Sequence, residues 1–176
     1  IGEPDFPSTA AVIEAGRRAL TDGMIHYTAA NGMPALRKAI AGYYRGRFGV
    51  SVDPARVIIT PGASGALQLV LGTTINPGDR VLMTDPGYPC NRHMVSMFGG
   101  IPVSIPVDRA QGFVIPPERV AAHREDGVKA LMLASPANPT GNLVELDAMR
   151  GLAAELPHDS GAILVCDEIY QGLQYE

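Results

Sequence analysis

Residues 162–172, AILVCDEIYQG, begin as a buried strand and then carry negative charge. Residues 162–165 form a short apolar run, of the kind that fills a sheet buried on both faces. Only Cys166 separates this run from the carboxylates of Asp167 and Glu168. A buried carboxylate is costly unless a cation or hydrogen-bond donors meet it. The stretch therefore predicts a strand whose carboxyl end faces a particular partner.

The sequence around Asp167 is compatible with several hydrogen-bonding or charged partners for its carboxylate. A positively charged ring N–H would serve, and so would a nearby arginine or the backbone N–H groups of the next turn. Glu168 is expected to be a solvated or capping residue, and Tyr170 follows three residues after Asp167.

Apolar runs and helical patterns alternate through most of the chain. Helices are expected at 9–20, 35–48, 62–74, 90–99, 116–124 and 145–156, and strands at 57–60, 80–85, 100–107, 129–134 and 162–166. Strands separated by helices pair in parallel through right-handed crossovers. The pattern predicts an α/β fold with a mostly parallel sheet and helices on both faces.

The composition excludes several classes of protein. Hydrophobic residues make up 46% and charged residues 18% of the 176 residues, and the net charge is −4. Neither a nucleic acid nor a membrane surface is expected as a partner, because no basic footprint or long apolar span is present. The four histidines lack metal-ligand spacing. Cys90 and Cys166 are too few for a disulfide framework and predict reduced thiols in a cytoplasmic protein.

In open α/β sheets, ligands bind beyond the carboxyl ends of the strands. The segment after Thr60, PGASGALQ, places small residues at the start of a helix, where unpaired N–H groups attract phosphate. A tight turn capped locally by Ser64 is the alternative. It is neither a Walker P-loop nor a GxGxxG motif.

Two further strand ends carry side chains suited to a ligand. Tyr88, in DPGYPC after Thr84, could lay its ring on a planar ligand or be a half-buried aromatic in a turn. Asn138, in SPANPTGN after Ala134, lies between two prolines. That amide is either aimed rigidly or part of an ordinary turn.

Taken in order, these segments resemble the class I and II aminotransferases, whose cofactor is pyridoxal 5′-phosphate (PLP). The similar stretches cover nearly the whole chain: IGEPDFP (1–7), HYTAANGMPALRKAIAGYY (26–44), PGASGAL (61–67), DPGYP (85–89), SPANPTG (135–141) and DEIY (167–170). Each is weak alone, and the ordered set is specific.

The resemblance implies a role for each residue around the cofactor ring. Asp167 matches the carboxylate that pairs with the pyridine nitrogen, and Tyr88 matches the aromatic residue that stacks on the ring. Asn138 and Tyr170 match the two residues that hydrogen-bond the 3′-oxygen. Asp167 and Tyr170 are thus the expected catalytic residues. An ionised Asp167 would keep the ring nitrogen protonated, which strengthens the cofactor as an electron sink.

The resemblance also implies phosphate, substrate and subunit contacts. Ala63 and Ser64 match the residues that hold the phosphate. Gly2 matches a glycine near the substrate carboxylate, where Asn138 is expected too. Tyr27 matches the tyrosine that reaches the phosphate of the neighbouring subunit, so a homodimer is expected. Asn138–Pro139 is a candidate cis peptide.

The implied division of the chain is an N-terminal segment, 1–32, with a helix and a substrate and dimer loop, and a partial cofactor-binding domain, 33–176. The family's Schiff-base lysine and small domain are missing, because neither Lys38 nor Lys129 matches the lysine. We therefore expect a fragment of an enzyme that moves an amino group between an amino acid and a 2-oxo acid, itself inactive. A PLP lyase or synthase, and the ligand-sensing domain of a PLP-binding transcription regulator, are the alternatives.

Overall fold

The computed structural model describes residues 6–123, 127–157, 159 and 161–173. It divides into two compact units, Ile1–Thr60 (unit 1) and Pro61–Glu176 (unit 2). None of the described helices is both long enough and apolar enough to cross a membrane. The predicted division at residue 32 concerns roles in binding and stays a prediction.

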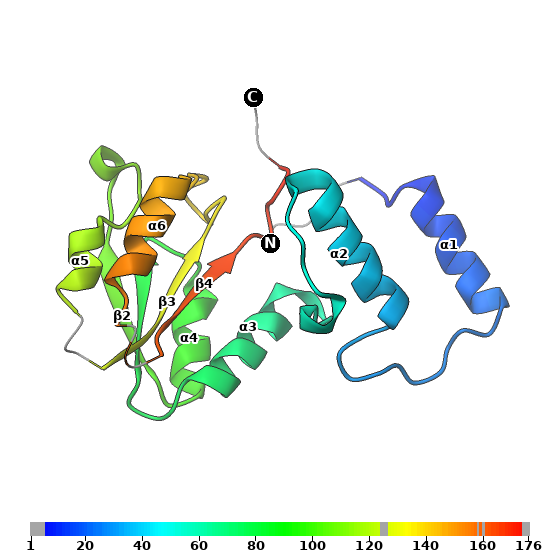
Figure 1. Cartoon of the computed structure of the whole chain (residues 1–176), viewed down its shortest axis with the longest axis horizontal. Helices are drawn as coiled ribbons and strands as arrows, with labels where there is room; N and C mark the ends of the chain where they lie inside the picture. The colour runs from blue at the N-terminus through cyan, green and yellow to red at the C-terminus, as the bar shows by residue number, and fades with distance from the viewer. Residues whose placement is uncertain (1–5, 124–126, 158, 160, 174–176) are drawn as a thin grey trace. The chain divides into compact units, whose positions relative to one another are not determined.

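Unit 2 is built on a parallel four-stranded sheet (Figure 1). The strands are β1 (Arg80–Asp85), β2 (Ile101–Pro106), β3 (Val128–Ala134) and β4 (Ile163–Asp167), in the order β2-β1-β3-β4. Its helices are α3 (Gly62–Thr74), α4 (Pro89–Met97), α5 (Pro117–Ala121) and α6 (Leu146–Glu155). Every neighbouring pair of strands is parallel. The predicted α/β fold is confirmed.

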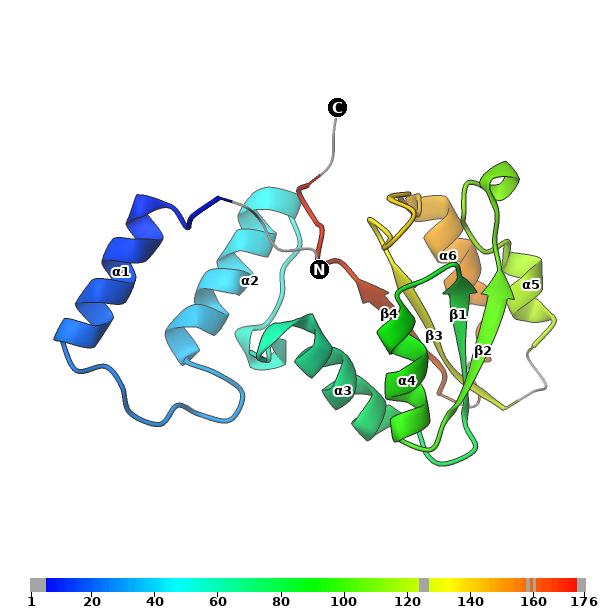
Figure 2. The ribbon, with the colours of Figure 1, turned by 180° about the vertical axis from the view of Figure 1, so that it is seen from behind.

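Alternate residues of the strands pack into two separate cores. Leu82 and Leu131 belong to a cluster that includes residues of α5 and α6. Val81 and Met132 belong to a second cluster, with residues of α3 and α4. Because successive strand side chains point to opposite faces, helices must cover both faces of the sheet. Figure 2 shows the sheet from behind, with β1 and β2 side by side.

The structure corrects two expectations about the strands. β4 is half-buried along its whole length rather than buried, because it pairs only with β3 in the described part of the chain. Residues 57–60 form no strand. The Ile59 N–H donates to the Asn31 carbonyl at 3.2 Å, so this segment bonds to a loop and not to a strand.

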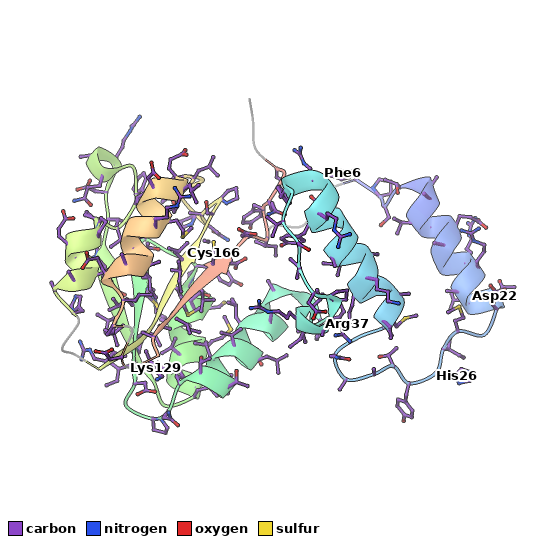
Figure 3. The ribbon with its side chains drawn as sticks, in the orientation of Figure 1. Phe6, Asp22, His26, Arg37, Lys129 and Cys166 are labelled. Atoms are coloured by element: carbon purple, nitrogen blue, oxygen red, sulfur yellow. The ribbon has the colours of Figure 1, made fainter. Side chains whose placement is uncertain are left out.

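Unit 1 contains α1 (Ala10–Thr21), α2 (Pro34–Phe48) and the short 3₁₀ helix η1 (Pro54–Arg56). Pro34 fits the first turn of α2, where its missing N–H is not needed, and Gly49 ends the helix in a left-handed conformation with φ 68°. Arg37 donates from Nε to the Val57 carbonyl at 2.8 Å and from Nη2 to the Pro54 carbonyl at 2.7 Å (Figure 3). This side chain therefore ties α2 to the turn that follows it.

Candidate functional site

The polar residues singled out in unit 2 follow strands that end side by side. β3 and β4 stop in register, with Ala134 opposite Asp167, and β1 is the other neighbour of β3. The pairing continues one residue further, since the Ser135 N–H donates to the Asp167 carbonyl at 3.0 Å. The segments with Tyr88 and Asn138 begin at this edge, where parallel α/β sheets bind ligands.

Asp167 is half-buried rather than buried, and it has a local partner. Its Oδ1 accepts a hydrogen bond from the Ile169 N–H at 3.0 Å, so the expected alternative of a capped turn is present. Within the described residues, no arginine forms an ion pair with Asp167 and no group donates to Oδ2. Glu168 is exposed, as expected of a solvated residue, and accepts a side-chain hydrogen bond from Gln171 Nε2 at 3.0 Å.

Asn138 and Tyr170 meet across the loops that follow β3 and β4. Asn138 Nδ2 lies 3.4 Å from the Tyr170 hydroxyl oxygen and donates a long hydrogen bond to it. The Asn138–Pro139 peptide bond is cis, as expected. Both side chains line a pocket of about 470 Å³, together with Pro136, Ala137, Pro139, Gly141, Leu143 and Leu173. This pocket has two polar side chains in an otherwise apolar lining.

Tyr88 lies at the N-cap of α4 with 38% of its surface exposed. The side chain of Cys90 raises the pKa of Tyr88 most, and partial desolvation, Tyr170 and Asp167 raise this pKa further. The phenol is therefore within electrostatic range of Asp167, the last residue of β4, and of Tyr170 in the segment that follows.

The first turn of α3 supplies backbone donors without side-chain capping. Pro61 is the N-cap and contributes no cap hydrogen bond, while Gly62 adopts φ 76°. Ala63 is half-buried and Ser64 is exposed. First-turn N–H groups have no intrahelical acceptor, and they form the positive end of the helix dipole.

Two predicted site residues do not belong to the described part of unit 2. Tyr27 belongs to unit 1, in a loop, and its side chain is fully exposed. Gly2 lies outside the described residues. Lys129 is the second residue of β3, at the opposite end of the sheet from Cys166 (Figure 3).

Sequence reasoning missed several residues at this edge. Leu143 and Leu173 line the pocket, and Arg92 lies 3.9 Å from Asp85 in an exposed ion pair at the end of β1. The only signal for the leucines was an apolar residue soon after each polar segment. Ser135 Oγ accepts from the Val144 N–H at 3.0 Å, a contact between residues nine apart that no local pattern predicts.

The carboxyl edge of a parallel α/β sheet is where domains of this class bind ligands, and polar side chains gather at that edge here. The sequence matches the family described as aminotransferase class I and II over residues 1–176. The chain belongs to this family.

Relatives and solved structures agree with the family. The chain is 42% identical over 176 residues to a probable aspartate/prephenate aminotransferase of Thermus aquaticus, covering 99% of this chain and 45% of that protein. An aminotransferase structure from Mycobacterium tuberculosis superposes with a TM-score of 0.93 at 35% identity, covering 100% of this chain and 45% of that one. Aspartate aminotransferase from Thermus thermophilus with maleate gives a TM-score of 0.94 at 38% identity, covering 100% and 46%. The chain thus spans less than half the length of these proteins.

Proposed function

We propose that the protein to which this chain belongs is a PLP-dependent aminotransferase that moves an amino group between an amino acid and a 2-oxo acid. The observation that carries the proposal is the placement of Asp167 and of the Asn138–Tyr170 pair at one edge of the sheet. The family match and the aminotransferase names of the relatives support the same reaction class.

The hydrogen-bonding capacity of these residues fits a pyridine ring with an adjacent oxygen. Among the described residues, Asp167 accepts only through Oδ1, from the Ile169 N–H, so Oδ2 can accept an N–H from the ring nitrogen. The Asn138 amide carries two hydrogens, of which Tyr170 takes one, and the Tyr170 hydroxyl keeps its own hydrogen to donate. Two donors can therefore converge on the 3′-oxygen.

Each of these groups has a defined task in the proposed reaction. Bound PLP would supply an electron sink for bond changes at the substrate's α-carbon. Asp167 would hold a proton on the ring nitrogen, and Asn138 and Tyr170 would favour the deprotonated 3′-oxygen by donating to it. Tyr88 would cover one face of the ring.

The phosphate is assigned to the start of α3. The N–H groups of Ala63 and Ser64 and the Ser64 hydroxyl are the proposed donors, because the positive end of the helix dipole favours a dianion there. Pro61, at the N-cap, contributes no side-chain hydrogen bond to the Ala63 and Ser64 N–H groups.

We further propose a homodimer in which Tyr27 reaches the partner's cofactor phosphate. Unit 1 supports an interface because many of its large apolar side chains are exposed, which is unusual for a surface that meets only water. Examples are Val12, Leu20, Met24, Ile25, Tyr27 and Tyr43. Gly2 near the substrate carboxylate and a cytoplasmic location stay predictions, the latter supported by two free cysteines.

The test uses the whole protein, with added PLP and a panel of amino acids paired with 2-oxo acids. We expect a visible absorption band on PLP addition and amino transfer between at least one pair. Stoichiometric PLP binding without any amino transfer would contradict the proposed reaction. A product of elimination or condensation would favour the lyase or synthase alternative. Failure to bind PLP would contradict the cofactor.

A further inference from the structure

The loop that carries Asn138 is closed by a side chain that none of the proposed roles uses. This loop, residues 135–144, joins the end of β3 to the start of α6. Inside it, the Ala137 N–H donates to the Asn142 carbonyl at 2.9 Å and the Gly141 N–H donates to the Ala137 carbonyl at 2.8 Å. These bonds hold the turn together but do not attach it to the sheet.

Ser135 makes that attachment through two groups, its backbone N–H and its side-chain hydroxyl. Its N–H donates to the Asp167 carbonyl at 3.0 Å, which fixes the base of the loop to the last residue of β4. Its Oγ accepts the Val144 N–H at 3.0 Å, which fixes the far end of the loop. The Val144 side chain packs against the core cluster around Leu131, so the far end is anchored in the core as well.

Asn138 and Asp167 must keep a fixed separation if they are to contact two atoms of one rigid ring. The Asn138 side chain itself contacts the segment after β4 through Tyr170, at 3.4 Å, which is long for a hydrogen bond. Because the contact between Asn138 and Tyr170 is weak, the position of the Asn138 amide depends on how its loop is attached through Ser135. Catalytic geometry depends on such support, because a misplacement of about 1 Å can cost roughly a hundredfold in rate.

We propose that Ser135 is a positioning residue that fixes the Asn138 amide relative to Asp167, and so sets how strongly Asn138 donates to the ring oxygen. The inference rests on the proposed function. Replacing Ser135 by alanine leaves the backbone bond to Asp167 and removes only the acceptor of the Val144 N–H.

The test compares Ser135→Ala in the whole protein with Ser104→Ala, which removes an exposed hydroxyl from β2, and with Ser135→Thr, which keeps the acceptor. The first readout is hydrogen exchange without cofactor. We expect the Val144 amide to exchange roughly tenfold faster in Ser135→Ala alone, as the loss of one net hydrogen bond implies.

The second readout is the pH midpoint of the absorption change of bound PLP. Donors to a charged oxygen favour its deprotonated form, so a displaced Asn138 raises this midpoint. We expect an upward shift of roughly half a pH unit in Ser135→Ala and little change in Ser104→Ala or Ser135→Thr.

The outcomes separate the two proposals. PLP bound normally, with Ser135→Ala matching Ser104→Ala in either readout, overturns the role of Ser135 and leaves the aminotransferase proposal standing. An equal shift in Ser135→Thr also overturns it, because the hydroxyl would not be the cause. A wild-type protein that binds no PLP overturns both.

Discussion

Unit 1 and unit 2 come from one chain but bury their apolar residues to very different extents. In unit 2, both faces of the sheet carry buried clusters, and residues such as Leu71, Leu82 and Leu131 have no exposed surface. In unit 1, α1 buries no residue and α2 buries only Ala41. The unit with a core of its own contains the proposed ring and phosphate contacts, and the other contains Tyr27.

This difference indicates which parts of the proposed function depend on further protein. A sheet covered on both faces holds its edge residues in place without help. Exposed apolar helices reach full burial only against another surface. The contacts of Asp167, Asn138 and Tyr170 are therefore expected to persist in this chain alone, whereas the proposed role of Tyr27 would require a second subunit.

The largest effect is expected from truncating the core of unit 2. In the 176-residue chain, Leu82→Ala should lower the free energy of unfolding by about 2–5 kcal/mol, because it opens a cavity where no water reaches. Leu20→Ala in α1, 72% exposed, should change it by about 0.5 kcal/mol or less. Urea unfolding followed by circular dichroism measures both. Equal losses would show that α1 is packed in this chain.

A smaller effect is expected at Gly32, where two segments of unit 1 approach closely. A Cβ on Gly32 would clash with the side chain of Ile59, and Gly32 has φ 96°. Gly32→Ala should therefore cost about 2–4 kcal/mol. Gly42→Ala in α2 meets nothing within 4 Å and should stabilise by up to about 1 kcal/mol. If thermal melts of the two variants coincided, residues 57–60 would not be held against the loop as described.

The two cysteines of unit 2 should differ in reactivity. Burial, followed by the charges of Glu168 and Asp167, raises the pKa of Cys166 from 9.0 to about 11. At pH 8 only about 0.1% of Cys166 is then thiolate, the reactive form. Iodoacetamide labelling with peptide mapping should modify the exposed Cys90 first, because the raised pKa and partial burial of Cys166 leave little reactive thiolate there.

The same shift has a consequence for stability. The unfolded chain loses the Cys166 proton near pH 9 and the folded chain only near pH 11, so this group's contribution falls as the pH rises between those values. Cys166→Ser should remove that part of the pH dependence. Fast labelling of Cys166 at pH 8 would show that β4 is more open than described.

The fold was predictable because its signals are local. Apolar runs and helical periodicity predict each strand and α-helix of unit 2 to within a few residues, though not the 3₁₀ helix η2 (Arg109–Gln111), and their alternation predicts parallel pairing. The predicted strand at 57–60 was wrong, because an apolar run does not reveal whether a partner strand is present. The half-burial of β4 was not predicted either, because the order of strands in a sheet depends on residues far apart in the sequence.

The candidate site was predictable only in part. Asp167, Asn138 and Tyr170 stood out because charged or rigidly held polar residues followed apolar strands. The Ser135–Val144 bond and the pocket leucines depend on how a loop returns to its base, which spacing alone does not encode. The resemblance supplied roles, and the structure supplied the proximity of Asn138 to Tyr170.

The central claim, that the carboxylate ending β4 controls the cofactor ring, is tested most directly by comparing Asp167→Ala with Glu168→Ala in the whole protein. Bound PLP and turnover are measured in both. We expect Asp167→Ala to lower turnover by roughly a hundredfold or more while retaining most of the cofactor, because the phosphate contacts remain. Glu168→Ala, which removes an exposed carboxylate one residue away, should leave both nearly unchanged. Unchanged transamination in Asp167→Ala would contradict the account.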